Sequence, residues 1–331
     1  MTPRTIGSLS VPPLCLGGNV FGWTADEDAS FAVLDAFVEG GGTFIDTADS
    51  YTAWVDGNSG GESETIIGRW LARHAVGRRD DVVVATKVGA HPDRRGLTPK
   101  NIRAAAEDSL RRLNTDRIDL YYTHFDDEGV PVGEIITALD DLVREGKVRE
   151  IGASNISPER LAESLEFSEA EGKARYTALQ PHYNLVSRET YEGPLSGVAE
   201  RYGLACVPYF ALARGFLTGK YRPGTDAVDS PRAGKAAEYL ETARGPRVLA
   251  ALDRVATAHG VEPATIALAW LADRPGVAAP IASARDIGQL PPLLASLDLR
   301  LTDVEREELT AASEPGGALG AGGGVTPRRN G

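Results

Sequence analysis

The sequence predicts an α/β protein built as one (β/α)₈ barrel, also called a TIM barrel. Eight short apolar runs recur along the chain, and each is followed by an amphipathic helical pattern. These runs are too uniformly apolar for strands with one face in water, so they fit parallel strands covered on both faces. The chain has 331 residues, which is the usual size of eight strand–helix units closed into a barrel.

We expect the strands in chain order at Leu14–Leu16, Thr43–Ile45, Val82–Thr86, Ile118–Tyr122, Val148–Ala153, Thr177–Leu179, Leu204–Val207 and Val277–Ile281. The expected helices are Asp26–Glu39, Glu62–His74, Thr98–Leu113, Val132–Glu145, Pro158–Gly172, Glu192–Tyr202, Arg247–His259, Pro263–Asp273 and Asp286–Leu294. Acidic residues open the first helix and the glycines after it are a stop signal. A Thr–Pro pair opens the third helix in the same way.

Two features depart from ideal units. A long segment, Ala211–Gly245, separates the seventh strand from its helix, and loops of that length are usually functional. A further helix, Thr302–Ser313, follows the eighth unit, with Thr302 as a plausible cap. We therefore expect one barrel domain over residues 1–313 with a long loop after the seventh strand, and a glycine-rich, disordered tail over residues 314–331.

A doubly wound sheet is the competing fold. It would need a G-x-G-x-x-G fingerprint after its first strand, and the segment there reads GGNVFG. The glycine cluster Gly320–Gly324 comes close to that spacing, but it follows no strand and opens no helix. The barrel is therefore favoured.

Composition excludes several classes of protein. The formal net charge is −12 and the pI is about 5.0, which argues against a general nucleic-acid or anionic-membrane binder. There is no apolar run of about 20 residues and no secretory signal, so we expect a cytoplasmic protein. Cys15 and Cys206 are then free thiols. The histidines are dispersed and no zinc spacing exists, so no metal site is expected.

Polar and aromatic residues follow the predicted strands. In such barrels, chemistry gathers at the carboxyl ends of the strands. The residues at those ends are Asp46 and Tyr51, Thr86 and Lys87, His124, Ser154 and Asn155, Gln180, and Tyr209. Taken singly, each has an ordinary structural explanation. Taken together, Asp, Lys, Tyr and His suit a proton-donating tyrosine: a cation lowers the pKa of the phenol, an acid holds the cation, and an imidazole orients a carbonyl.

Six motifs in this order, FIDTADSY, ATKVG, YYTHFDD, IGASN, LQPHYN and ARGFLTGKY, resemble the signatures of the aldo-keto reductase family. The resemblance runs from about Leu14 to Ala312. Its catalytic tetrad maps onto Asp46, Tyr51, Lys87 and His124. The resemblance implies reduction of an aldehyde or ketone by hydride transfer from NADPH, with Tyr51 as general acid.

The resemblance also implies a binding site for NADP(H), with NAD(H) less favoured. Its cofactor contacts map onto Ser154, Asn155, Gln180, Tyr209, Leu212, Arg214, Gly215, Leu217, Gly219, Lys220, Ser283, Arg285 and Gln289. Arg285 is the residue that argues for the 2′-phosphate of NADP(H), because a guanidinium matches a phosphate by its planar fork of donors. The chain departs from the family at Leu293, where relatives often carry an adenine-contacting Asn, and at Phe210, where a small Ser is common.

We expect Trp23, Trp54 and Phe125 to wall a pocket for a small carbonyl substrate, with His91 as a further candidate. Two other readings stay open. One is a nicotinamide-binding, redox-sensing regulatory subunit with the same fold and little turnover. The other is a barrel isomerase or aldolase that uses Lys87 as a Schiff base, which Asp46 would disfavour by keeping the amine protonated.

Overall fold

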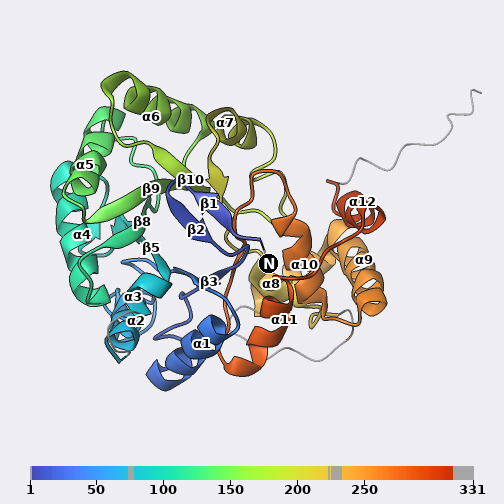
Figure 1. The fold of residues 1–331 in the computed structure, drawn as a ribbon. Helices are drawn as coiled ribbons and strands as arrows, with labels where there is room; N and C mark the ends of the chain where they lie inside the picture. The colour runs from blue at the N-terminus through green and yellow to red at the C-terminus, as the bar shows by residue number, and fades with distance from the viewer. Residues whose placement is uncertain (1, 74–77, 223, 225–232, 316–331) are drawn as a thin grey trace, which may run out of the picture.

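A ring of parallel strands forms the centre of the molecule (Figure 1). The structure, a computed structural model, describes residues 2–73, 78–222, 224 and 233–315. The ring contains β3 (Cys15–Gly17), β4 (Phe44–Asp46), β5 (Val83–Val88), β8 (Ile118–Thr123), β9 (Val148–Ser154), β10 (Tyr176–Gln180), β11 (Ala205–Cys206) and β12 (Ile281–Ala282). Neighbours in this order pair in parallel, and β12 pairs with β3.

The ring closes between β11 and the segment before β12. The amide of Cys206 donates to the carbonyl of Gly276 at 2.8 Å, and the amide of Ala278 donates to the carbonyl of Cys206 at 2.7 Å. Every strand is therefore hydrogen-bonded on both sides, as a barrel requires. The predicted (β/α)₈ barrel is confirmed.

Helices surround the ring and bury their apolar faces against it (Figure 1). The larger ones are α1 (Glu27–Glu39), α2 (Glu62–Arg73), α4 (Pro99–Leu113), α5 (Val132–Arg144), α6 (Pro158–Glu171), α7 (Pro194–Tyr202), α9 (Arg244–His259), α10 (Pro263–Ala272), α11 (Leu290–Ala295) and α12 (Asp303–Ala312). Side chains of Asp26, Thr98, Ser157 and Thr302 accept hydrogen bonds from the first turns of α1, α4, α6 and α12. The helix starts therefore follow capping chemistry that the sequence displays.

An N-terminal hairpin, β1 (Arg4–Ile6) and β2 (Leu9–Val11), lies across the centre of the barrel (Figure 1). Ile6, Leu9 and Val11 are buried in the same apolar cluster as the residues that fill the barrel interior, such as Phe44 and Leu120. The hairpin thus closes one end of the barrel. This hairpin is absent from the elements predicted above.

The long segment after β11 contains short helices instead of one continuous element. They are the 3₁₀ turns η1 (Ala213–Thr218) and η2 (Glu238–Glu241) and the helix α8 (Ala233–Ala237). Two more short helices stand elsewhere, α3 (Arg78–Asp81) and η3 (Ile287–Gln289). Residues 223, 225–232 and 316–331 lie outside the described part, so the predicted tail is outside it apart from its first two residues.

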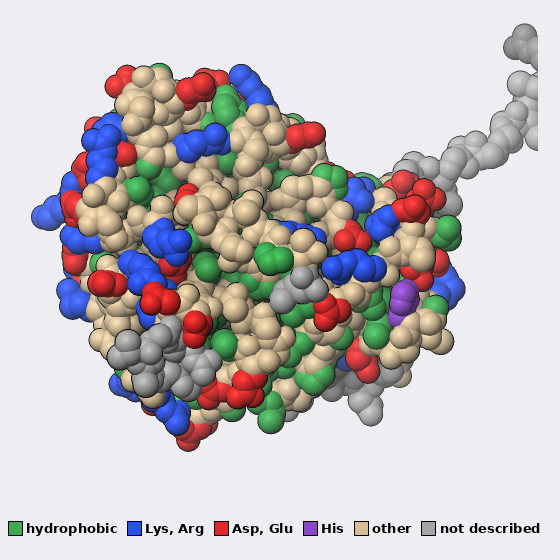
Figure 2. Space-filling view, viewed as in Figure 1, with side chains coloured by type: hydrophobic (Ala, Val, Ile, Leu, Met, Phe, Trp, Pro, Cys, Tyr) green, Lys and Arg blue, Asp and Glu red, His purple; other side chains and the backbone are tan. Residues whose placement is uncertain are grey.

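Acidic and basic side chains are interspersed over the outer helices on the face seen in Figure 2. Arg103 on α4, for example, pairs with Asp141 and with Glu145 of the neighbouring helix region. The charge of −12 is therefore not gathered into one acidic patch on this face. No helix among the described residues is both long and apolar enough to cross a membrane.

Candidate active site

A buried ion pair forms the base of the site at the carboxyl ends of two neighbouring strands. Asp46 is the last residue of β4 and Lys87 is the penultimate residue of β5, and each is only 1% exposed. Lys87 Nζ lies 2.7 Å from Asp46 Oδ2 and donates to the carbonyl of Thr47, also at 2.7 Å. Gln180 Nε2, at the end of β10, donates to the other carboxylate oxygen of Asp46 at 2.8 Å. Buried charges persist when they are paired and hydrogen-bonded in this way.

The hydroxyl of Tyr51 completes this network from the loop after β4. Lys87 Nζ is 2.8 Å from the Tyr51 hydroxyl, and that hydroxyl is 3.2 Å from Asp46 Oδ2. The next residue, Thr52, has the unusual φ of +72°, and its hydroxyl donates to Glu62 Oε2 on α2 at 2.6 Å. This bond holds a strained turn in place, and strained turns gather at functional sites.

His124 follows β8 directly and borders the same network. Its ring centroid is 6.1 Å from that of Tyr51, and its Nδ1 is 3.5 Å from the Ser50 hydroxyl. Burial, and then the positive charge of Lys87, lower the pKa of His124 to about 3. The imidazole is therefore neutral at physiological pH and has one N–H to donate.

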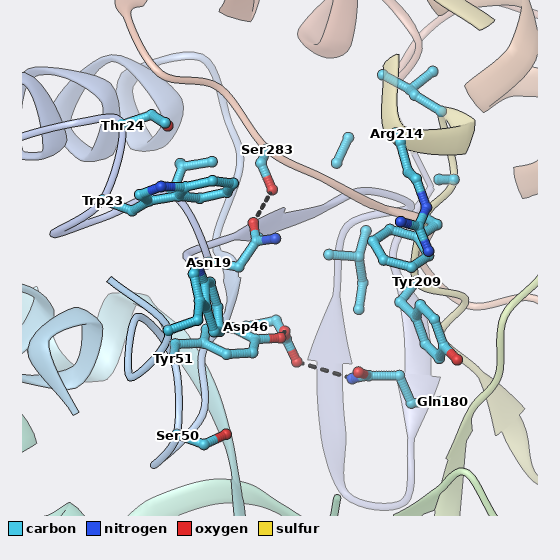
Figure 3. Close-up of a pocket in the computed structure, with 18 of the residues that line it drawn as sticks. Asn19, Trp23, Thr24, Asp46, Ser50, Tyr51, Gln180, Tyr209, Arg214 and Ser283 are labelled. Atoms are coloured by element: carbon cyan, nitrogen blue, oxygen red, sulfur yellow. Dashed lines mark hydrogen bonds between the residues drawn. The ribbon is translucent and has the colours of Figure 1, made fainter. Parts of the chain in front are cut away.

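A cavity of about 690 Å³ opens beside these residues (Figure 3). Asp46, Tyr51 and His124 line it, while Lys87 is buried behind them. Figure 3 shows Trp23 and Tyr51 on one side of the cavity and Tyr209 and Arg214 on the other. The volume is within the range of small-molecule and cofactor sites.

The residues expected to hold a carboxamide form one cross-bonded group on the cavity wall. The Ser154 hydroxyl donates to the carbonyl of Gln180 at 2.8 Å, and Asn155 Nδ2 donates to the carbonyl of His124 at 2.8 Å. The Tyr209 hydroxyl donates to Asn155 Oδ1 at 2.9 Å. His182 stacks on Tyr209 with centroids 5.5 Å apart. Since Tyr209 also lines the cavity, its other face can receive a flat ring.

The loop after β11 brings positive charge to the cavity. Leu212, Arg214, Gly215 and Lys220 line it, together with Thr218. Arg214 has a φ of +60°, and its guanidinium lies 4.5 Å from the centre of the Phe210 ring. Leu217 is buried in the core, and neither it nor Gly219 lines the cavity. These two expected contacts therefore lie behind the residues of the loop that line the cavity.

The loop after β12 contributes Ser283, Arg285 and Gln289 to the same cavity. The backbone amide of Arg285 donates to Gln289 Oε1 at 3.1 Å, which braces the start of this loop. Leu293, by contrast, is 3% exposed and packs in the core of the protein. Leu293 does not line the cavity.

The aromatic rings of Trp23, Trp54 and Phe125 line the cavity. Trp23 and Trp54 meet edge to face with centroids 5.8 Å apart, and Trp54 lies 6.3 Å from Tyr51. Phe125 stacks on His124 at 4.8 Å. Trp54 and Phe125 are both about half exposed, which is unusual for large apolar side chains and typical of binding surfaces.

Several lining residues were not anticipated from the sequence. Asn19 accepts a hydrogen bond from the Ser283 hydroxyl at 2.7 Å (Figure 3). A second hairpin, β6 (Ala90–His91) and β7 (Arg94–Arg95), brings Arg95 to the cavity. The sequence signal for this hairpin was the turn-forming pair Pro92–Asp93, which lies between Gly89 and Gly96. His91 is buried instead of lining the cavity.

A barrel whose strand ends join tyrosine, lysine, aspartate and histidine beside a cavity with basic loops has the layout of an oxidoreductase. Within the described residues, no group of three or more His, Cys, Asp or Glu side chains could hold a metal ion. The chain belongs to the aldo/keto reductase family, whose model matches residues 13–314. This membership confirms the resemblance found in the motifs and supports carbonyl reduction as the general chemistry.

The chain is similar to several proteins over nearly its whole length. The oxidoreductase YrpG of Bacillus subtilis is 36% identical over 304 residues, covering 88% of this chain and 89% of that protein. Norsolorinic acid reductase B of Aspergillus parasiticus is 31% identical, covering 93% of this chain and 82% of that protein. The aldo-keto reductase yakc [NADP(+)] of Schizosaccharomyces pombe is 30% identical, covering 96% and 93%.

Proposed function

We propose that this protein reduces an aldehyde or ketone to the alcohol, with NADPH as the hydride donor and Tyr51 as the general acid. One observation carries the proposal: the Tyr51 hydroxyl lies 2.8 Å from a buried ammonium, Lys87 Nζ, beside a cavity large enough for cofactor and substrate. A phenol so placed can release a proton, because the adjacent cation stabilises the phenolate that forms.

Each member of the tetrad has a separate task in this mechanism. Tyr51 gives its proton to the carbonyl oxygen as negative charge develops there. Lys87 stabilises the resulting phenolate, and Asp46 holds the lysine in place through a 2.7 Å contact. Gln180 fixes the orientation of Asp46 by donating to its second oxygen.

His124 orients the substrate. Because its pKa is lowered to about 3, its ring stays neutral and donates one hydrogen bond without carrying charge. A carbonyl oxygen held between this N–H and the Tyr51 hydroxyl would face both groups. The oxygen would thereby be fixed for proton transfer, and no second proton source would compete with Tyr51.

The cavity residues fit a nicotinamide dinucleotide. Tyr209 offers an aromatic face next to a group of amide side chains that can both donate and accept, as a carboxamide requires. Arg214, Lys220 and Arg285 supply positive charge for phosphates. When bound, NADPH would supply the hydride. The chain itself supplies the ring platform and the charges.

The Schiff-base alternative is weakened by the same contacts. Lys87 Nζ faces Asp46, the carbonyl of Thr47 and the Tyr51 hydroxyl. An amine bonded to an ionised carboxylate is kept protonated, and a protonated amine is not a nucleophile. The regulatory-subunit alternative differs from our proposal in turnover, so a turnover assay separates the two.

The test of function is steady-state turnover. Purified protein with NADPH and a panel of aldehydes and ketones should oxidise NADPH and form alcohol in equal amounts. Binding of NADPH without alcohol formation on any member of the panel would favour the regulatory reading.

The cofactor preference is tested at Arg285. Arg285→Ala should weaken NADPH binding roughly tenfold or more and NADH binding far less, because one charge-assisted phosphate contact is worth about 1.5–3 kcal/mol. Arg222→Ala is the matched control, because Arg222 pairs with Asp253 on α9 and does not line the cavity. Equal losses for the two cofactors would remove the 2′-phosphate assignment.

A further inference from the structure

One basic residue of the cavity has no part in the mechanism above. Arg214, Lys220 and Arg285 come from the loops after β11 and β12, where the cofactor contacts gather. Arg95 instead comes from the β6–β7 hairpin that follows β5. Its neighbours in the lining from this hairpin are Ala90 and Pro92. Arg95 therefore lies apart from the loops that carry the expected cofactor contacts, and its exposed side chain borders the cavity.

The register of the hairpin sets the direction of the Arg95 side chain. Ala90 pairs with Arg95 and His91 pairs with Arg94. Residues directly opposite each other in an antiparallel pair share a face, and adjacent residues take opposite faces. Ala90 and Arg95 both line the cavity, whereas His91 is buried and Arg94 binds Asp108 on α4. The two arginines thus point to opposite sides of the hairpin.

The backbone under Arg95 is firmly held. Asn101 Nδ2 on α4 donates to the carbonyls of Arg94, Arg95 and Gly96, at 2.8, 3.2 and 2.7 Å. Asp127 accepts from the amide of Leu97 at 2.9 Å, which ties the end of the hairpin to the loop after β8. Such bracing reduces the conformational entropy lost when the hairpin contacts a ligand.

Within the described part of the chain, the guanidinium of Arg95 has no hydrogen-bond or ion-pair partner, in contrast to that of Arg94. The one carboxylate that lines the cavity belongs to Asp46, which is already paired with Lys87. A forked cation facing a cavity without a free carboxylate is suited to binding an anion from solution.

We propose that Arg95 selects carbonyl substrates that carry a carboxylate at a distance from the carbonyl group. This inference rests on the proposed function and names its substrate class. The aromatic walls formed by Trp23, Trp54 and Phe125 would pack on the body of the substrate. Tyr51 and His124 would hold the carbonyl oxygen, and the Arg95 fork would bind the carboxylate. The favoured substrate is thus an aromatic or otherwise flat aldehyde or ketone acid.

The experiment compares two aldehydes of the same shape, para-carboxybenzaldehyde and para-methylbenzaldehyde. Wild type should prefer the charged aldehyde in kcat/KM. In Arg95→Gln, the ratio of the two kcat/KM values should fall roughly tenfold, mainly through KM, because a contact equal in ground and transition states changes KM. Raising the salt concentration should lower the wild-type ratio in the same direction.

Arg94→Gln is the matched control, since it removes the same charge from the opposite face of the hairpin. In Arg94→Gln, the ratio of kcat/KM for the charged aldehyde to that for the uncharged aldehyde should stay at the wild-type value. An unchanged ratio in Arg95→Gln, or an equal fall in both variants, would overturn the proposal. Unequal NADPH affinity between Arg95→Gln and wild type would instead place Arg95 among the cofactor contacts, and would also overturn it.

A binding measurement separates this inference from the proposed function. Tryptophan fluorescence, reporting from Trp23 and Trp54, is titrated with para-carboxybenzyl alcohol and with para-methylbenzyl alcohol. Tighter binding of the charged alcohol that is lost in Arg95→Gln supports the carboxylate site even if turnover is absent. If turnover is present but the two alcohols bind alike, carbonyl reduction stands and the Arg95 proposal fails.

Discussion

Asp46 is the last residue of β4 and Asp49 lies three positions later in the loop that follows. Both side chains are equally buried at 1% exposure, but their surroundings differ. Asp46 faces the ammonium of Lys87 and the amide of Gln180. Asp49 has no hydrogen-bond partner among the described residues for either carboxylate oxygen, although the backbone of Ser50 and Gly89 lies near. Burial, and then the nearby charge of Glu64, raise the pKa of Asp49 to about 7.

The comparison shows that burial alone does not make a useful catalytic charge. A carboxylate stays ionised in the interior when a cation and hydrogen-bond donors replace the lost water. Asp46 has these partners and can hold Lys87 next to Tyr51. Asp49 lies near Glu64 of α2, Arg112 of α4 and Tyr121 of β8, where its ionised form is disfavoured.

Removing the cation beside Asp46 should have the largest effect. Lys87→Met should lower kcat by about a thousandfold or more, since it removes the charge that stabilises the Tyr51 phenolate. It should also destabilise the fold by about 3–5 kcal/mol by leaving Asp46 buried and unpaired. The measurements are single-turnover NADPH oxidation and urea unfolding.

The double variant Lys87→Met with Asp46→Asn is the control for stability. It removes both charges, so most of the lost free energy of unfolding should return while kcat stays low. Recovery of kcat in the double variant would mean that the ion pair serves folding alone.

The next effect concerns Arg112, the cation near Asp49. Arg112 Nε binds Glu64 Oε2 at 2.6 Å, and Glu64 is fully buried. Arg112→Gln should lower the free energy of unfolding by about 3 kcal/mol, because the Glu64 charge loses its partner. Arg111→Gln, which breaks the exposed pair with Asp108 on the same helix, should leave stability nearly unchanged. Equal effects of the two variants would contradict the role given to Glu64.

The last effect is the pH dependence due to Asp49. An acid whose folded-state pKa is about 7 binds its proton more tightly than in the unfolded chain, where the pKa is about 3.9. Its contribution to stability is complete below pH ~4 and is lost as the pH rises through about 7, on the order of a few kcal/mol. The measurement is the free energy of unfolding, obtained from urea unfolding at several pH values between pH 4 and pH 8. Asp49→Asn should remove the part of its decline with pH that Asp49 causes. If the free energy of unfolding depends on pH in the same way for wild type and variant, Asp49 does not have the raised pKa.

Sequence patterns predicted the barrel and the strand-end residues because both depend on short-range periodicity. Asp46, Lys87, Gln180 and His124 occupy strand ends, so the fold class alone brings them to one rim. The family resemblance added the role of Tyr51, whose contact with Lys87 depends on the path of a loop.

Features that depend on side-chain direction could not be predicted in this way. The hairpin that closes the barrel lies outside the repeating strand–helix pattern that predicted the other strands. Arg94 and Arg95 are adjacent and chemically identical, and only the hairpin register separates their faces. The burial of Leu217 likewise follows from how the loop after β11 coils, with Arg214 and Gly215 at positive φ.

The central claim is that Tyr51 is the proton donor for carbonyl reduction. The most direct measurement is single-turnover NADPH oxidation by wild type and Tyr51→Phe, with NADPH affinity measured alongside by fluorescence. Tyr51→Phe keeps the ring and removes only the hydroxyl, so NADPH affinity should be unchanged while the reduction rate falls by a factor of about 10²–10⁴, the usual worth of a general acid. Equal rates in the two proteins would contradict the mechanism.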